Sequence, residues 1–334
     1  MVRLSELIKK SKEGRLQEKE KILTKANQLK ENSESYQGIQ KAYELAVFRI
    51  KHIMMEIKRG KTVDGKEIVS LADNIVENLQ IRHQTFLSLI HNFTQYSDGN
   101  DYLFSHSINV AVLAVNLGIS MDYKKEELVD LCISALVHDI GMLNVPQEII
   151  AKPGKLTREE FERIREHPAD GLKLLENINS LPKTVSEVIY QHHEKINGRG
   201  YPDGKSMNEI SKSAQIVGIA EIYEAMTHHR PYRIKSFIPF EAVKNIVKEE
   251  KDSFSPELLK VFLNYITFYP MGSYVRLNSG EIGKVVSVNP DAPLRPVIEI
   301  IRNPEGRFSE IPIHIDLEKS PVLYIEKALD ENEF

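Results

Sequence analysis

Apolar side chains recur at intervals of three and four residues along most of the chain before position 269. This spacing places them on one face of an α-helix, so the pattern predicts a mainly helical protein. The expected helical segments are Leu4–Asn32, Ile39–Lys58, the apolar stripes within 68–79 and 86–93, Leu103–Leu117, Leu128–Val137, Glu159–His167, Ala169–Leu175, Thr184–His193, Ala214–Thr227, Phe240–Glu250 and Pro256–Phe268.

After Tyr269-Pro270 the pattern changes to short runs in which apolar and polar residues alternate, which is typical of β-strands. Asparagine, proline and glycine clusters between the runs are suited to tight turns. We therefore expect a small antiparallel sheet or barrel at the C-terminal end. Its strands should lie in Ser273–Leu277, Glu281–Val288, Val297–Ile301 and Ile311–Leu317.

Two glycines, Gly60 and Gly65, interrupt the helical pattern and mark a boundary. We expect three parts: a helical N-terminal region of unknown role in residues 1–60, a larger helical domain in 61–268, and a β-rich extension in 269–334. The first helix carries little apolar surface, which favours a solvated helix over a pairing surface.

Composition narrows the class of protein. The 334 residues are 41% hydrophobic with a formal net charge of −4, which argues against disorder and against a basic surface for nucleic acid. Cys132 is the single cysteine, so no disulfide forms within the chain and a reducing cytoplasm is expected. No run reaches the ~18 uninterrupted apolar residues of a membrane helix.

The main candidate site in the sequence is a set of histidines with a neighbouring carboxylate. Imidazole and carboxylate ligands suit Fe, Mn or Zn, and a carboxylate can bridge two such ions. Each histidine alone is more often a hydrogen-bonded core or capping residue, so the ordered set carries the prediction of a binuclear centre. The set is His106, His138, Asp139, His167, His192 and His193.

A glycine-rich loop follows the last histidine pair directly. Glycines allow close backbone approach, and Tyr201-Pro202 adds a rigid aromatic feature on which a flat base could stack. Gly-Tyr-Pro alone is common in turns, so its position after His192-His193-Glu194 gives it weight. Downstream, the planar guanidinium groups of Arg230 and Arg233 are suited to phosphate.

Together these motifs make the sequence similar to the HD-GYP family of cyclic di-GMP phosphodiesterases, a branch of the HD-domain metallohydrolases. The resemblance covers about residues 63–268 and implies a helical HD-domain bundle. It is carried by residues 101–110, His138-Asp139-Ile140-Gly141, Glu166-His167-Pro168, Gln191-His192-His193-Glu194, Gly198-Arg199-Gly200-Tyr201-Pro202-Asp203-Gly204 and Arg230-Pro231-Tyr232-Arg233.

The resemblance implies a division of the ligands between two divalent ions. His106, His138 and Asp139 would hold one metal, and His167 and His192 the second, with Asp139 shared. His193 would lie beside them. Family members with a third metal carry an acidic residue where this chain has Tyr102, which implies two metals here.

Two positions depart from the family pattern. Glu221 stands where the family has its last ligand, an aspartate, so it either ligates through a longer side chain or forms an ion pair instead. Met142 replaces the lysine of His-Asp-x-Gly-Lys. Losing that ammonium at a phosphate commonly costs ~10²–10³ in rate, so activity would be slow unless a different cation substitutes.

The family also implies a mechanism and partners. Asp139, His138 and Arg230 would be catalytic, and a hydroxide between the metals would attack phosphorus, giving linear pGpG and, with a second cut, GMP. Subunit pairing and contact with diguanylate cyclases are further implications. The substrate would contact Gly200, Tyr201, Pro202, Arg230, Arg233 and the Met142 position.

The sequence also leaves two other functions open. The chain could be a receptor or scaffold that binds cyclic di-GMP with little turnover, given Met142 and Glu221. It could also be an HD phosphohydrolase acting on another cyclic dinucleotide.

Overall fold

The computed structural model describes residues 38–92, 102–228, 236–266, 268–289 and 292–329. The chain divides into two compact units between Leu45 and Ala46. A helix that is described from residue 38 to residue 58 spans this division. The predicted boundaries of the three parts stay predictions.

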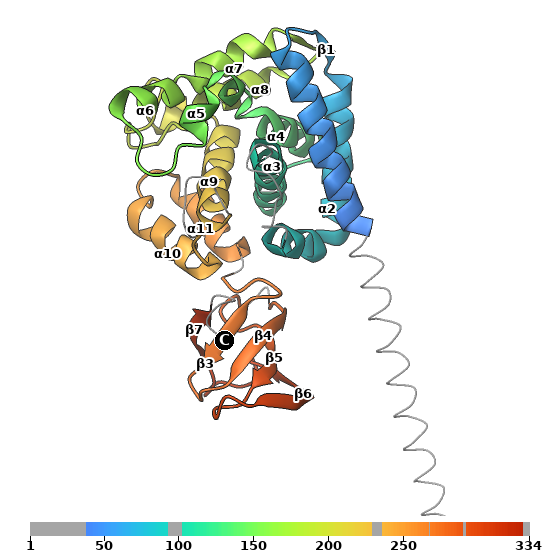
Figure 1. Ribbon diagram of the computed structural model, residues 1–334, viewed down its shortest axis with the longest axis vertical. Coiled ribbons are helices and arrows are strands. Elements are labelled where there is room, and N and C mark those ends of the chain that lie inside the picture. The colour runs from blue at the N-terminus through green and yellow to red at the C-terminus, as the bar shows by residue number, and fades with distance from the viewer. Residues whose placement is uncertain (1–37, 93–101, 229–235, 267, 290–291, 330–334) are drawn as a thin grey trace, which may run out of the picture. The chain divides into compact units, whose positions relative to one another are not determined.

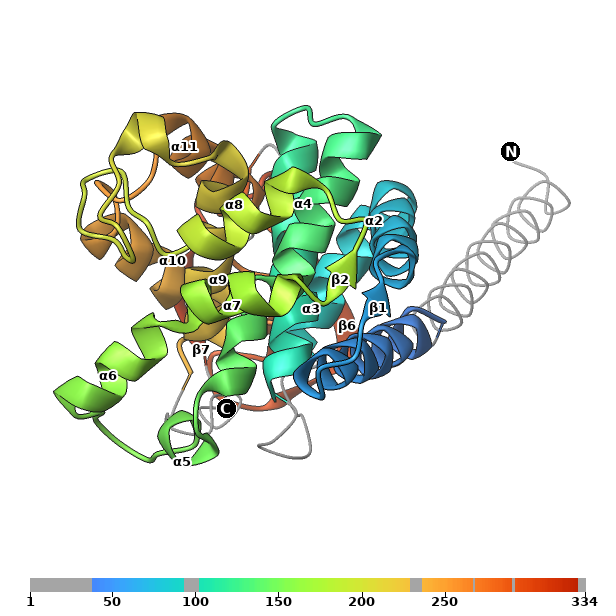
Figure 2. The ribbon, with the colours of Figure 1, turned by 90° about the horizontal axis from the view of Figure 1, so that it is seen from above.

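An apolar helix, α3 (Tyr102–Ser120), is the centre of the helical domain. It packs against α2 (Lys66–Asn92), α4 (Lys125–Val137) and α9 (Lys212–Thr227). Figures 1 and 2 both show α3 lying between α2 and α9. By length and hydropathy α3 could cross a membrane, but 89% of its most apolar window is buried inside the protein, as in the core helix of a globular domain.

The other helices follow the predicted segments closely, and some begin at side-chain caps. Thr157 and Glu160 form a capping box at the start of α6, and the Ser211 hydroxyl accepts from the backbone N–H of Ala214 at the start of α9. These helices are α6 (Arg158–Arg165), α7 (His167–Leu175), α8 (Lys183–Gln191), α10 (Pro239–Glu249) and α11 (Pro256–Tyr265).

Several short elements escaped the sequence pattern because they contain too few residues to show a period. They include a two-stranded parallel sheet that joins β1 (Val63–Asp64) to β2 (Ile178–Asn179). The rest are η1 (Ile140–Asn144), α5 (Gln147–Ile150) and η2 (Met207–Glu209).

The predicted antiparallel sheet at the C-terminal end is confirmed, with strand order β6-β5-β4-β3-β7. Its buried side contains Val275, Leu277, Val285 and Ile298, which alternate with more exposed residues along the strands. A fifth strand was missed by the sequence analysis. The strands are β3 (Tyr274–Leu277), β4 (Ile282–Ser287), β5 (Val297–Arg302), β6 (Phe308–Asp316) and β7 (Ile325–Leu329).

Candidate metal centre

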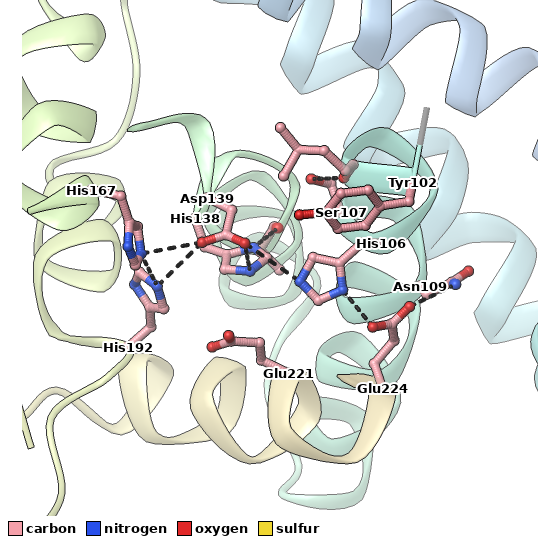
Figure 3. A network of polar contacts seen from close by, with 12 residues as sticks. Tyr102, His106, Ser107, Asn109, His138, Asp139, His167, His192, Glu221 and Glu224 are labelled. Atoms are coloured by element: carbon pink, nitrogen blue, oxygen red, sulfur yellow. Dashed lines mark hydrogen bonds and ion pairs between the residues drawn. The ribbon is translucent and has the colours of Figure 1, made fainter. Parts of the chain in front are cut away.

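Side chains from five separate segments converge at one buried point in the helical domain (Figure 3). The segments meet there because α3, α4, η1, α7, α8 and α9 pack on one another. Two groups of candidate ligands share Asp139, and the ligand atoms within each group lie within 4.8 Å of one another. One group is His106, His138, Asp139 and Glu221, and the other is Asp139, His167, His192 and His193.

The two carboxylate oxygens of Asp139 face different histidines. Oδ1 lies 3.2 Å from His167 Nε2 and 3.7 Å from His192 Nε2. Oδ2 lies 3.6 Å from the Nε2 atoms of both His106 and His138. Asp139 therefore stands between two pairs of imidazoles, in the position of a carboxylate that bridges two ions.

Backbone carbonyl groups fix the tautomers of three rings. The Nδ1 atom of His138 lies 2.7 Å from the carbonyl oxygen of Ala135, and those of His167 and His192 make the same contact with residues 164 and 189 at 2.7 and 2.8 Å. A carbonyl only accepts, so each Nδ1 carries the proton. In this tautomer each ring can turn an Nε2 lone pair toward Asp139, as a metal ligand must.

The Nε2 atoms of these histidines converge around Asp139, and this arrangement suits a cation. His167 Nε2 and His192 Nε2 lie 3.1 Å apart, while the Nδ1 atom of each ring is already bound to a backbone carbonyl. Among the described residues, the buried atoms His138 Nε2 and Glu221 Oε2 have no hydrogen-bond partner. Burial and the neighbouring Asp139 raise the pKa of Glu221. A divalent ion would satisfy the lone pairs and offset the two carboxylates, so the clustered His and Asp residues support divalent metal binding.

Burial makes the metal-free centre sensitive to acid. It lowers the pKa of His138 to about 3, although Asp139 opposes this shift. An unfolded histidine has a pKa of about 6.5, so the unfolded state binds the extra proton first and His138 removes stability as pH falls from about 6.5 towards 3. We expect His138 to cost the chelator-treated protein about 2 kcal/mol between pH 7 and pH 5. Urea unfolding of His138→Gln should show this pH dependence reduced by that amount, and an unchanged dependence would contradict the prediction.

Glu224 is a buried residue of the centre that the sequence analysis missed. Its Oε2 lies 2.5 Å from His106 Nδ1, and its Oε1 accepts from Asn109 Nδ2 at 3.1 Å (Figure 3). A carboxylate behind a ligating imidazole orients the ring and raises its basicity. The one available signal was its position, one helical turn after Glu221 on α9.

Neutralising Glu224 should therefore weaken metal binding without removing a ligand. We expect Glu224→Gln to lower metal affinity ~10–100-fold, as is usual for such partners. Competition with a chromogenic chelator measures this directly. Glu241→Gln, at an exposed glutamate in the first turn of α10, is the control. Equal metal affinities in the two variants would contradict a role of Glu224 in metal binding.

Glu221 reaches the centre despite its departure from the family aspartate. Its carboxylate belongs to the group that contains His106 and His138, and its Oε2 also lies 3.7 Å from His193 Nδ1. The Glu221 carboxylate therefore lies near enough to the other candidate ligands to bind a metal, and near enough to His193 to form an ion pair. These are the two roles that the sequence left open. Its role as a ligand stays a prediction.

The glycine-rich loop is tied to the centre by Glu194, another residue whose role the sequence did not reveal. Glu194 is buried, and its carboxylate accepts from the backbone N–H groups of Asp203 at 2.7 Å, Gly204 at 3.1 Å and Lys205 at 2.8 Å. The Tyr201 ring stacks on His193 with 4.5 Å between the ring centroids. The loop is thereby held against the histidines.

A pocket of about 230 Å³ opens beside the centre. Asp139, His167, His193 and Glu221 line one part of it, so candidate ligands face its interior. Met142, Tyr102, Tyr201 and Lys152 line other parts. Arg230 and Arg233 lie outside the described residues. Gly200 and Pro202 belong to the loop but are not among the residues that line this pocket.

Comparisons with known proteins identify the family of the chain. A family model described as "HD domain" matches residues 92–258, and a "KOW domain associated with HD domain" matches 274–334. The first match covers half of the chain, so the chain belongs to the HD-domain family, as the motifs predicted. Bd1817, an HDG"Y"P protein from Bdellovibrio bacteriovorus, shares the fold, with a TM-score of 0.54 at 18% identity over 66% of this chain and 68% of that one.

Curated relatives carry related names. A cyclic di-GMP phosphodiesterase of Pseudomonas aeruginosa is 30% identical over 73% of this chain and 58% of its own length. The cyclic di-GMP phosphodiesterase PdeB of Borreliella burgdorferi is 34% identical over 61% of this chain and 53% of its own length. A 3'3'-cGAMP-specific phosphodiesterase of Vibrio cholerae is 35% identical over 45% of this chain and 34% of its own length. The chain spans about half the length of the first two.

Proposed function

We propose that this protein is a metal-dependent phosphodiesterase that hydrolyses cyclic di-GMP to linear pGpG. The observation that carries the proposal is the Asp139 carboxylate, whose two oxygens face two separate pairs of imidazole Nε2 atoms. A pocket adjoins this centre, and Tyr201 of the Gly-Tyr-Pro loop forms part of its wall. The names of the curated relatives support the substrate class.

The residues of the centre would hold two ions, one with His106, His138, Asp139 and Glu221, the other with Asp139 and the remaining histidines. When bound, divalent metals supply an activated water and positive charge at the phosphate. Imidazole and carboxylate ligands fit both Fe and Mn, and we include both in the proposal.

Tyr201 would orient the substrate. Burial and the nearby carboxylates of Glu221 and Asp139 raise its pKa, so the phenol stays protonated at neutral pH and can donate a hydrogen bond into the pocket. The Arg165 guanidinium lies 4.9 Å from the centre of the same ring. This contact and the His193 stack hold Tyr201 in place, which reduces the entropy lost when substrate binds.

The test is hydrolysis of cyclic di-GMP by anaerobically purified, metal-analysed protein loaded with Mn or Fe. We expect pGpG, identified by chromatography, in an amount that falls to background in His138→Ala/Asp139→Ala. An inert wild type with two metals bound, beside an active Met142→Lys, would instead establish a receptor with little turnover. The same assay also shows whether pGpG is converted further to GMP.

A second substrate is favoured by one observation, the 35% identity to the 3'3'-cGAMP-specific enzyme over 151 residues. The same enzyme batch should therefore receive cyclic di-GMP and 3'3'-cGAMP in parallel. The larger kcat/KM identifies the substrate, and a preference for 3'3'-cGAMP of tenfold or more would overturn the assignment to cyclic di-GMP.

Subunit pairing, contact with a diguanylate cyclase and a cytoplasmic location complete the proposal and rest on the resemblance and the composition. Light scattering of the purified full chain tests the first of these, because a mass near 38.2 kDa means a monomer.

A further inference from the structure

The pocket beside the metal centre contains one cationic side chain among the described residues that line it, and that side chain is Lys152. The same pocket contains the carboxylates of Asp139 and Glu221. A phosphodiester is an anion, so a pocket that binds it beside two carboxylates needs positive charge from outside the metal ligands as well. Met142, at the position of the family lysine, lines the pocket but carries no charge.

Lys152 is held at the pocket by Glu160. Its Nζ lies 2.8 and 2.6 Å from the two carboxylate oxygens of Glu160, and its side chain is 31% exposed. Glu160 is itself fixed, because its carboxylate accepts from the backbone N–H of Thr157 at 2.7 Å in the capping box of α6. The ammonium therefore has a defined position when no anion is present.

The ion pair with Glu160 does not prevent a change of partner. An ion pair that is this accessible to water is weak, because water competes for both charges. Lysine also has a flexible stem of four carbons and three donors that can be reoriented. A phosphate oxygen can therefore accept a hydrogen bond from Lys152 at little cost.

We propose that Lys152 is a phosphate-binding cation of this pocket and takes the place of the family lysine that Met142 replaces. The ammonium donates to a non-bridging oxygen of the phosphodiester and stabilises the charge that develops there. This inference rests on the proposed phosphodiesterase function, and it assigns a substrate-contacting role to a residue 10 positions beyond Met142 in the sequence.

Lys152→Met, compared with Lys155→Met, tests the role of Lys152. Lys155 lies exposed in the same loop and is not among the residues that line the pocket. Both proteins should receive cyclic di-GMP and bis(4-nitrophenyl) phosphate, a generic diester, after metal analysis. We expect Lys152→Met to lose ~10²-fold in kcat/KM with unchanged metal content, and Lys155→Met to stay within about twofold of wild type.

Rescue separates a phosphate contact from a purely structural role. Adding Met142→Lys to Lys152→Met should recover at least about tenfold of the lost kcat/KM, because the second ammonium enters the same pocket. If Lys152 acted only by holding the loop through Glu160, a lysine at position 142 would restore nothing. That result, or a Lys152→Met enzyme within threefold of wild type, overturns the inference.

Failure of the proposed function would give a different result. A wild type that cleaves neither ester in an Asp139-dependent manner would refute the phosphodiesterase assignment. Calorimetry with inorganic phosphate and metal-loaded protein then tests Lys152 by itself. Affinity at least about tenfold weaker in Lys152→Met supports the cation role, and equal affinity in the two proteins refutes it.

Discussion

Asp139→Asn should lose metal and abolish hydrolysis together, with kcat/KM lowered by at least ~10³-fold. The amide keeps the shape of the carboxylate but offers one neutral oxygen where Asp139 presents two charged ones to two pairs of histidines. One change therefore weakens both candidate ion sites. The measurement is metal content by mass spectrometry on the same samples that are assayed for pGpG.

Asp122→Asn is the matched control for this change. Asp122 is exposed and lies outside both candidate ligand groups. Its backbone φ of 58° is one that asparagine also tolerates, so the substitution adds no strain. It should keep wild-type metal content and activity. An Asp139→Asn protein that retains two metals and full turnover would contradict the assignment of Asp139 as the shared ligand.

Gly141→Ala should produce the second large effect, on stability and metal binding alike. A Cβ atom at this position would overlap the carbonyl oxygen of His167 and lie 2.6 Å from the backbone N of Gly171. Both are backbone atoms, so η1 and α7 must separate to make room, and that movement draws Asp139 away from His167. We expect a loss of about 3 kcal/mol in the free energy of unfolding, at the upper end for overpacked sites.

Urea unfolding of the metal-free proteins measures the effect on stability, and metal titration measures the effect on metal binding. Gly38→Ala is the control, because Gly38 lies in a helix, has no described residue within 4 Å of the added Cβ and has no positive φ. Its stability should stay equal to wild type or rise by about 0.4–1 kcal/mol. A Gly141→Ala protein as stable as this control would show that the two segments do not need their close approach.

The fold was largely predictable because its helices bury long apolar faces. The expected segment Leu103–Leu117 falls within α3, and Ala214–Thr227 falls within α9. The strand β7 was missed because its exposed centre, Glu326-Lys327, breaks the apolar alternation. Similarly, the α4 pattern gave no sign that the chain turns at Asp139 into η1, since apolar residues continue on both sides of the turn.

The candidate site was predictable in its residue types but not in its supporting contacts. The order of the histidines and Asp139 indicated ligands, because few structural roles require so many imidazoles beside a carboxylate. Glu194 and Glu224 are ordinary glutamates in the sequence. Their roles arise from tertiary packing, which places Glu224 behind His106 and folds the loop back on Glu194. Lys152 likewise becomes a pocket residue only when the chain after α5 returns to the centre.

The most direct test is whether Asp139 serves two ions at once. Electron paramagnetic resonance of protein titrated with Mn²⁺ measures this, with metal content determined in parallel. We expect two Mn²⁺ per chain and a spin-coupled spectrum, because ions that share one carboxylate lie about 3.5–4 Å apart. The coupled signal should disappear in Asp139→Asn. A wild-type protein that saturates with one ion per chain and gives only the six-line spectrum of isolated Mn²⁺ would contradict the binuclear centre.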